Sequence, residues 1–442
     1  MKKTGAALLA LAAHLAFGPS VFGNGLNINS LGTRAMSMGG AFVGLADDFT
    51  SVFWNPAGLT RMRTAAFGVA GTDIIPSGTY NLTVPPPRGT GTMVDTRTLT
   101  RHYLGGIAAY VHPISPALVA AVGVYTPSGI GVAWDGTRMA AVSGGRTDIE
   151  WESRVGLVTI APTLAYRAGD TFSVGLSLNI NYGVFDTSMY AGTQDLTPFG
   201  LSYLAFDLGQ YRDSETGWGL GATLGVQFRP NAKLSFGAVL RSASNVKFRG
   251  SAVISNLALL GAKSESDMRR DLTWPMGIAV GAAVVPMDGL TLTADIQWMQ
   301  WSKIRSIATS YLDPTWAALM KASGRSELSM AWQDTLQLRF GGEYQIRPGL
   351  VVRAGFYVDP SAGPDTTMNI FLPNYDFKGL TLGAGYHLGS LTLDFGLEFL
   401  IGDERSINPG LLEIDPAYAH AVPGVYRMNI LAPSLAVMYR FD

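Results

Sequence analysis

Long stretches of this 442-residue chain alternate strictly between apolar residues and polar or glycine residues. From Phe172 to Val184, every second residue is apolar, and Ser, Gly and Asn stand between them. Segments 217–229, 334–347 and 390–401 show the same period. A period of two is typical of a β-strand with two different faces. The sequence therefore predicts an all-β fold whose strands each have one greasy and one polar face.

The connections between the predicted strands alternate in length. About fourteen strands are expected, at 64–75, 102–112, 117–126, 153–167, 171–186, 217–229, 233–249, 270–285, 289–301, 334–347, 350–359, 377–388, 390–401 and 426–441. From the second strand onward, every other connection is a short turn, and the rest are long loops. An even number of strands with short periplasmic turns and long outer loops is typical of bacterial outer-membrane barrels. The sequence predicts a transmembrane antiparallel β-barrel of about 14 strands.

Composition agrees with a membrane protein. Only 15% of the residues are charged and the mean hydropathy is +0.19, whereas soluble domains carry roughly 25% charged residues. The longest segment without Asp, Glu, Lys or Arg beyond residue 23, 102–134, contains Pro113, Pro116 and Pro127 and several glycines, which a spanning helix would hardly tolerate. A closed barrel remains the expected way of crossing the bilayer.

The first residues predict export. Lys2 and Lys3 precede an apolar run, 6–17, and Pro19 breaks it. This pattern predicts a signal peptide over 1–23, with Asn24 as the new N-terminus, and the apolar run is short for a membrane anchor. The expected location is the bacterial outer membrane, which the chain crosses many times.

Residues 24–63 precede the first strand and show no alternation. They mix small and polar residues and keep Phe49, Phe53 and Trp54 close together, which a disordered periplasmic tail would hardly do. A barrel of this size is wider than its own side chains can fill. We therefore expect 24–63 to form an N-terminal hatch (plug) inside the lumen and 64–442 to form the barrel. Asp47 or Asp48 is expected to cap the turn that follows it.

The chain resembles the long-chain fatty acid outer-membrane transporters of the FadL type, which include toluene and xylene uptake proteins. The strongest carriers of the resemblance are Ala46-Asp47-Asp48 and Asn55-Pro56-Ala57, which look like the hatch motif of that family. Further similarity runs through 166–176, 218–221, 275–276, 301–302, 339–344 and 353–357, so it spans nearly the whole mature chain. The resemblance implies a 14-stranded barrel with a hatch, and a kinked third strand that opens the wall sideways.

The residues themselves indicate where such a kink would fall. Pro127 follows the third predicted strand and removes a backbone donor, and Gly129 and Gly131 weaken strand pairing. On the residues alone, this segment could equally begin an ordinary loop. Together with the resemblance, it is the expected lateral opening.

The expected function is uptake of hydrophobic compounds, above all long-chain fatty acids, with aromatic hydrocarbons as the alternative cargo. Burying a sixteen-carbon acid gains about 12 kcal/mol at roughly 0.8 kcal/mol per methylene, so release needs a part that moves. We expect the hatch to rearrange around Asn55-Pro56-Ala57 and the cargo to leave sideways into membrane lipid. The protein is expected to be a monomer.

Charged residues on the polar faces of the strands are expected in the lumen, where they would hold the hatch: Asp295, Arg339, Glu343, Arg353, Asp394 and Glu398. Arg339 and Arg353 could instead meet the carboxylate headgroup of a ligand.

Other classes of function find little support in the sequence. The mature chain has four histidines, His102, His112, His387 and His420, and none is well placed for a catalytic triad. The chain has no cysteine, no His-Glu-x-x-His and no Gly-x-Ser-x-Gly. We expect no enzyme activity, no metal and no cofactor, and the net charge of −1 gives no case for nucleic acid. A barrel enzyme, an unspecific porin and an adhesin remain alternatives.

Overall fold

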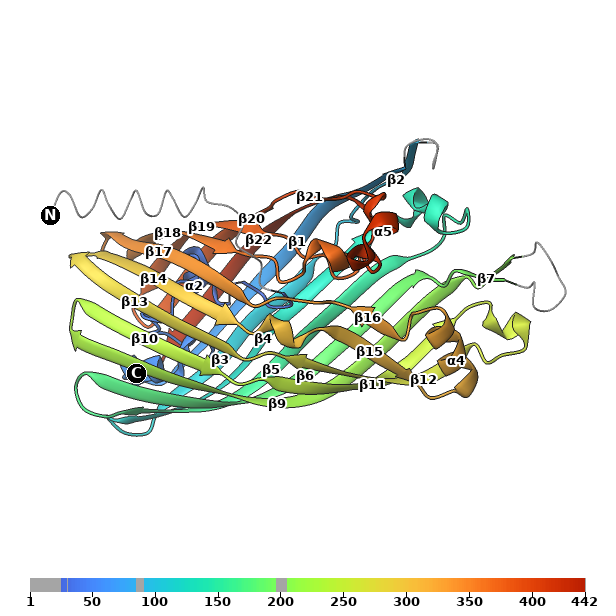
Figure 1. Cartoon of the computed structure of the whole chain (residues 1–442). Coiled ribbons are helices and arrows are strands. Elements are labelled where there is room, and N and C mark those ends of the chain that lie inside the picture. Colours follow the sequence, from blue (N-terminus) through green and yellow to red (C-terminus); the bar gives the residue numbers. More distant parts are fainter. Residues whose placement is uncertain (1–24, 30, 85–90, 196–204, 442) are drawn as a thin grey trace.

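The computed structural model describes residues 25–29, 31–84, 91–195 and 205–441, and the predicted signal peptide lies outside the described residues. In this part of the chain, antiparallel strands form a closed barrel of 14 strands (Figure 1). The barrel closes because β1 (Ala66–Val84) pairs with β3 (Tyr103–Pro113) along one edge and with β22 (Gly424–Arg440) along the other. The predicted fold class is confirmed.

The remaining wall strands follow in chain order, each antiparallel to its neighbour. Eight are continuous: β4 (Leu118–Trp134), β5 (Trp151–Arg167), β6 (Phe172–Tyr190), β9 (Gln210–Asn231), β17 (Thr335–Arg347), β18 (Leu350–Asp359), β19 (Phe377–Leu388) and β20 (Leu391–Gly402). Three are interrupted: β10 (Leu234–Arg241) with β11 (Ser244–Ile254), β12 (Glu265–Trp274) with β13 (Gly277–Met287), and β14 (Leu290–Met299) with β15 (Ser306–Tyr311). Pro275 stands in the second of these breaks, where a missing N–H is tolerated.

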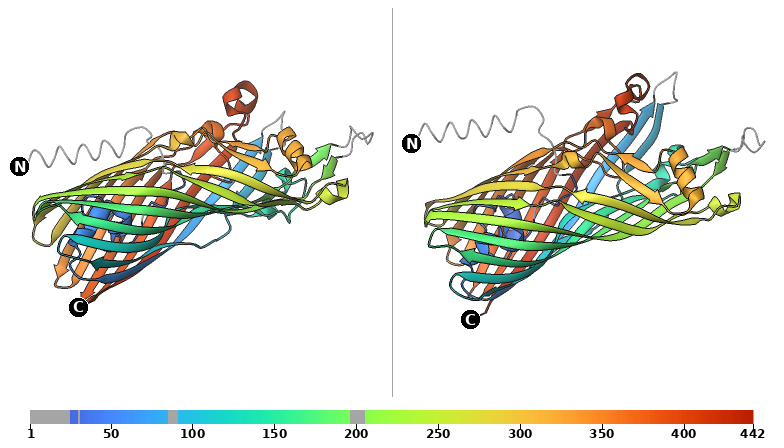
Figure 2. Two further views of the ribbon diagram at one scale, coloured as in Figure 1. Left: turned by 90° about the horizontal axis from the view of Figure 1, so that it is seen from below. Right: turned by 60° about the horizontal axis from the view of Figure 1, so that its bottom comes forward.

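The connections alternate as predicted, with tight turns at one end of the barrel and long loops at the other (Figures 1 and 2). The long loops carry short strands: β2 (Gly91–Arg97), β7 (Thr193–Asp195), β8 (Ala205–Asp207), β16 (Glu327–Ser329) and β21 (Arg405–Ile407). They also carry helices: η2 (Gly136–Arg138), η3 (Ala140–Val142), η5 (Leu257–Leu260), α4 (Pro314–Ala322), η7 (Asp365–Thr367), α5 (Leu411–Ile414) and η8 (Pro416–Tyr418). A further short helix, η6 (Trp301–Lys303), lies in the break between β14 and β15. Across the described ranges, no helix is long and apolar enough to cross a bilayer.

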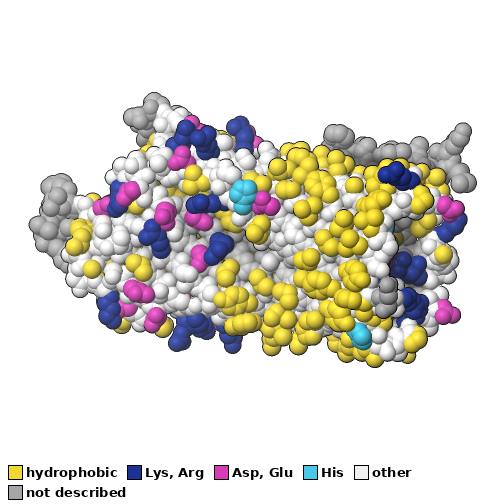
Figure 3. Space-filling view, turned by 180° about the vertical axis from the view of Figure 1, so that it is seen from behind, with side chains coloured by type: hydrophobic (Ala, Val, Ile, Leu, Met, Phe, Trp, Pro, Cys, Tyr) yellow, Lys and Arg dark blue, Asp and Glu magenta, His cyan; other side chains and the backbone are white. Residues whose placement is uncertain are grey.

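The apolar faces of the strands point outward. Leu220 and Leu435 are each 65% exposed, although both are large and apolar. Figure 3 shows that such side chains gather in a band over the half of the barrel away from the long loops, whereas charged side chains are scattered over the other half. Contiguous exposed apolar surface of this kind is what a lipid-facing barrel requires.

Aromatic residues at several strand ends are exposed, as the two membrane interfaces of a barrel require: Trp218, Tyr110, Tyr166, Tyr344, Tyr386 and Tyr439. Trp301 differs from them, because it is fully buried. It follows β14 in η6, which turns the indole inward against Trp332, with the ring centroids 5.4 Å apart.

The segment before β1 folds inside the barrel as α2 (Thr33–Ser37), α3 (Ser51–Trp54) and η1 (Pro56–Arg61), drawn in blue in Figures 1 and 2. We call residues 25–62 the hatch. Its side chains are almost entirely buried, including Phe42, Val52 and Leu59. Wall glycines allow this close contact: a Cβ on Gly383 would lie 2.0 Å from Ser37 Oγ, and one on Gly355 would lie 2.1 Å from the backbone nitrogen of Gly39.

Several predicted strand ends were wrong. The first strand was expected to end at residue 75 but continues to Val84, and the strand expected to begin at residue 217 begins at Gln210. The third barrel strand was expected to end at residue 126, but β4 continues through Pro127 to Trp134. The proline is tolerated because it falls at a register shift between Tyr125 and Ser128, where the ladder with β5 is interrupted. The long loop therefore begins after Trp134.

Candidate functional site

The wall of the barrel has a gap between β3 and β4. Their pairing ends at Ile107 and Tyr125. Beyond that point, Ser128–Trp134 pairs with β5 on the other side. The backbone N–H of Gly106 donates instead to the side-chain oxygen of Thr126, at 2.7 Å. The predicted kink residues Pro127, Gly129 and Gly131 thus lie where β4 has lost its neighbour.

The beginning of the hatch occupies this free edge of β4. The Ile28 N–H donates to the Pro127 carbonyl oxygen at 3.1 Å, and the Gly129 N–H donates to the Leu26 carbonyl oxygen at 3.0 Å. Asn27 and Ser128 form an antiparallel bridge between these two bonds. We call residues 25–29 the hatch tip. It takes the place that β3 would occupy in a regular wall.

Two cavities meet at the hatch tip. The first, the lumen cavity, has a volume of about 80 Å³ and lies inside the barrel beside Phe53 and Trp54 of the hatch. The second, the gap cavity, has a volume of about 520 Å³ and is lined by Gly129 and Gly131. Pro127 lines the lumen cavity, and Ile28 lines both. The tip therefore stands between the lumen and the gap in the wall.

The lumen cavity combines aromatic walls with a half-buried cation that the sequence analysis missed. The guanidinium carbon of Arg241 lies 4.1 Å from the centroid of the Phe53 ring, and the same group donates to the Phe53 carbonyl oxygen. In the described part of the chain, Arg241 forms no ion pair. The period of β10 contains the missing signal, since Phe236 and Leu240 face lipid and residue 241 must then face the lumen.

The two arginines that were predicted to meet a headgroup have different surroundings. Arg339 lines the lumen cavity, is 1% exposed, and donates to the carbonyl oxygen of Gly39 in the hatch at 2.9 Å. Arg353 does not line this cavity. It forms ion pairs with Glu343 and Asp394, both at 2.6 Å. Arg339 is thus placed where it can meet a ligand, whereas Arg353 is held by ion pairs within the wall.

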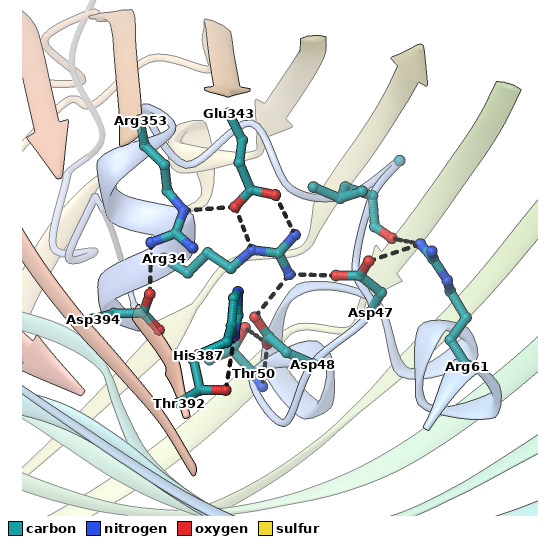
Figure 4. Close-up of polar contacts among 12 residues, drawn as sticks. Arg34, Asp47, Asp48, Thr50, Arg61, Glu343, Arg353, His387, Thr392 and Asp394 are labelled. Carbon is teal, nitrogen blue, oxygen red and sulfur yellow. Dashed lines mark hydrogen bonds and ion pairs between the residues drawn. The ribbon is translucent and has the colours of Figure 1, made fainter. Parts of the chain in front are cut away.

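A network of ion pairs joins the hatch to the wall (Figure 4). Arg34 of α2, which the sequence analysis did not single out, lies 2.6 Å from Asp47 and 2.9 Å from Glu343. Arg61 reaches the other oxygen of Asp47 at 3.1 Å. Glu343 continues the network to Arg353. The predicted lumen charges Glu343, Arg353 and Asp394 thus reach the hatch through Arg34.

The two adjacent aspartates of the hatch differ in their electrostatics. Burial by itself would raise the pKa of Asp47, but the charges of Arg34 and Arg61 outweigh it and hold that pKa below its ordinary value. Burial raises the pKa of Asp48 above its ordinary value. Asp48 caps the following turn by accepting from the Thr50 N–H at 2.8 Å, as predicted for one of the two.

Two further lumen residues, Asp295 and Glu398, were expected to hold the hatch. Asp295 accepts a hydrogen bond from the Val43 N–H of the hatch at 2.7 Å. Glu398 accepts from the Tyr357 hydroxyl at 2.8 Å, within the wall.

Asn55, Pro56 and Ala57 lie at the base of the hatch, where they are fully or almost fully buried. The side-chain amide of Asn55 donates to the carbonyl oxygens of Val43 in the hatch and Val226 in β9, at 3.0 and 2.9 Å. None of the three residues lines the lumen cavity or the gap cavity. The geometry of the motif is that of a fixed attachment to the wall.

The histidines lie in ordinary polar contacts. His387 approaches Thr392 at 3.1 Å, and His102 approaches Asp73 at 2.7 Å. Among the described residues, no three His, Asp or Glu side chains are grouped so that they could hold a metal ion.

Known proteins resemble this chain along nearly its whole length. Outer membrane protein P1 of Haemophilus influenzae is 23% identical, over 97% of this chain and 99% of that protein. Among solved structures, a FadL homologue of Pseudomonas aeruginosa has a TM-score of 0.74 at 17% identity, covering 95% of this chain and 100% of that one. The toluene transporter TodX of P. putida has a TM-score of 0.68 at 14% identity, covering 96% and 99%.

The match to a family is equally extensive. The family described as outer membrane protein transport protein (OMPP1/FadL/TodX) matches residues 10–441. The barrel and the outward-facing apolar band agree with a location in the bacterial outer membrane. The chain belongs to this family of outer-membrane transport proteins for hydrophobic compounds.

Proposed function

We propose that this protein takes up long-chain fatty acids, holds their carboxylate at Arg241 in the lumen cavity and releases them sideways through the gap between β3 and β4. The observation that carries the choice of cargo is that the half-buried Arg241 has no carboxylate partner among the described residues. A cation that is partly withdrawn from water without a counter-ion is costly, and an acid supplies one, whereas a neutral hydrocarbon does not. Arg339 adds a second cation to the lining of the same cavity.

The size of the lumen cavity supports a moving tip. Its volume of about 80 Å³ is well below the roughly 300 Å³ at which ligand pockets usually begin. Because Ile28 lines both cavities, displacement of the hatch tip would join the lumen to the much larger gap cavity. An acyl chain would then have a continuous path from the lumen to the lipid.

The attachments of the hatch support an exit to the side. The hatch beyond its tip is fixed by ion pairs from Arg34 and by hydrogen bonds from Asn55. The hatch tip is joined to β4 by the two backbone hydrogen bonds and by one from the Ser128 hydroxyl to Leu26, at 2.6 Å, and Asn29 joins its other end to Gln337 and Asp359. We assign the motion to the part of the tip that lies along β4, and we assign to the Asn55-Pro56-Ala57 motif the role of holding the rest of the hatch in place.

Aromatic hydrocarbons remain the second candidate cargo. Four aromatic side chains line the small lumen cavity: Phe53, Trp54, Tyr125 and Trp274. Such a lining suits a flat, neutral ring. The P. putida relative is named as a toluene transporter.

Binding of palmitate and toluene to the purified protein separates the two candidates. We expect Arg241→Gln to weaken palmitate binding on the order of tenfold, because a charge-assisted hydrogen bond is lost, and to leave toluene binding unchanged. Arg347→Gln, at an exposed arginine near a short turn, is the matched control. Palmitate binding that does not depend on Arg241, together with tight toluene binding, would favour the second candidate.

A further inference from the structure

Tyr103 lies at the end of β3 nearer the long loops and covers that part of the gap. It is the first residue of β3 and pairs with Ile74 of β1, beyond the point where β3 and β4 separate. Its ring lies over Gly131 of β4, since a Cβ on that glycine would be 2.5 Å from Tyr103 Cε1. The ring thus occupies the space that a side chain on β4 would otherwise fill.

The hydroxyl group of Tyr103 has no partner. Its oxygen is buried, and among the described residues it forms no hydrogen bond. Buried tyrosine hydroxyls usually find a partner, because an unsatisfied polar group is costly. Tyr103 lines the gap cavity, so a molecule that passes through the gap would come within reach of this donor.

Two other side chains that can donate hydrogen bonds line the gap cavity, and each is paired with an aspartate. Arg154 lines it, with its guanidinium 2.6 Å from Asp186, and His102 lines it near Asp73. Most of the remaining lining is apolar and includes Leu104, Ile130 and Val158. An apolar lining that includes a few donors fits an amphiphile that has an apolar chain and an acceptor headgroup.

We propose that Tyr103 is a specificity-determining residue of the lateral exit. Its hydroxyl donates a hydrogen bond to the carboxylate of an acid that leaves through the gap, and it gives a hydrocarbon of the same length no such help. This proposal rests on the proposed function, because it assumes that cargo leaves between β3 and β4. Tyr103 would thus be a second residue that selects acids over hydrocarbons, on the barrel wall and separate from Arg241.

Tyr103→Phe tests the role of the hydroxyl, because it keeps the ring over Gly131 and removes only the donor. Uptake of radiolabelled palmitate and hexadecane is measured with the full-length protein in proteoliposomes. We expect the variant to lower the palmitate rate by roughly threefold to tenfold and to leave the hexadecane rate unchanged. Tyr110→Phe is the control, since Tyr110 lies on the same strand, is exposed to lipid and contacts His112.

The outcomes separate this proposal from the one on which it rests. An unchanged ratio of palmitate to hexadecane uptake in Tyr103→Phe, with normal uptake by the parent protein, overturns the role of Tyr103 alone. Equal loss of both rates also overturns it, because a packing defect would act on both cargoes. If the parent protein takes up neither cargo, the proposed function itself fails.

Discussion

The backbone N–H of Ile28 donates to the carbonyl oxygen of Pro127, so a residue of the hatch continues the hydrogen bonding of a wall strand. The bond joins two segments that are about a hundred residues apart in sequence, and it forms where β3 has separated from β4. The gap is therefore closed by the part that would have to move for cargo to pass. Several measurable properties depend on this arrangement.

Locking the hatch tip to β4 should stop uptake. Asn27 and Ser128 face each other in an antiparallel bridge without mutual hydrogen bonds, a geometry that places Cβ atoms roughly 4.5–5.5 Å apart. The double variant Asn27→Cys/Ser128→Cys should form a disulfide, and the chain has no native cysteine that could compete. We expect palmitate uptake to fall at least about tenfold on oxidation and to recover with a reductant. Oxidised protein that transports at the normal rate would show that the tip does not move.

Filling the gap from the wall side should also block uptake. In Gly131→Val, the new side chain would meet the Tyr103 ring, because even its Cβ would lie 2.5 Å from that ring. Overpacking of this kind costs roughly 1–3 kcal/mol, so the barrel should still fold while the exit narrows. Gly71→Val is the control, since a Cβ on this β1 glycine has no atom within 4 Å. Uptake that is equal in the two variants would argue against an exit at this place.

The two neighbouring aspartates of the hatch should respond differently to loss of charge. Asp47→Asn removes a charge that pairs with Arg34 and Arg61, and should weaken docking of the hatch by roughly 3 kcal/mol. Asp48→Asn should weaken docking less, because Asp48 lies farther from Arg34, at 3.4 Å, and the amide oxygen can still accept from the Thr50 N–H. Protease sensitivity of the hatch measures docking. Similar sensitivity in the two variants would contradict the assignment.

Acid should loosen the hatch through the same residue. The pKa of Asp47 in the folded protein lies below its ordinary value. Its stabilising contribution is therefore fully present above about pH 4 and is lost as the pH falls through the lowered pKa. Protease sensitivity of the parent protein should rise over that acidic range, and Asp47→Asn should remove most of the rise. A rise that is the same in both proteins would assign the acid response to another group.

The contact between the hatch and β9 should limit the ion conductance of the barrel. A Cβ on Gly225 of β9 would lie 2.2 Å from the side-chain oxygen of Asn55. Gly225→Val should therefore push the base of the hatch away from the wall and raise single-channel conductance in a planar bilayer, from a low level in the parent protein to that of an open pore. Gly71→Val again serves as the control. High conductance of the parent protein would support the unspecific porin.

The sequence predicts the barrel well because strand period and loop length are local properties. A residue such as Leu220 must face lipid if its neighbours face the lumen, whatever the rest of the chain does. The hatch could be predicted for the opposite reason, because 24–63 lacks this period. The run of β4 through Pro127 was missed because a proline is harmless where the ladder is already irregular, and the irregularity involves the distant strand β5.

The contacts that define the candidate site are less predictable. The strand period places Arg241 in the lumen, but its lack of a carboxylate partner depends on how the hatch packs beside it. Arg34 lies in a segment without regular period, so neither its direction nor its contact with Glu343 can be inferred from spacing. The unpartnered hydroxyl of Tyr103 likewise follows from a separation of two strands that is visible only in three dimensions.

The attachment of the hatch tip to β4 bears on what drives transport. Two backbone hydrogen bonds and one from a serine hydroxyl join the tip to β4, while Asn29 joins its other end to Gln337 and Asp359. Each of the three bonds to β4 contributes only about 0.5–1.5 kcal/mol in net terms. Thermal motion can break a contact of this strength, and a ligand that favours the displaced arrangement can shift the balance by its own binding energy. Transport through such a device requires neither nucleotide hydrolysis nor an ion gradient. The direction of net flow would follow the chemical potential of the solute on the two sides.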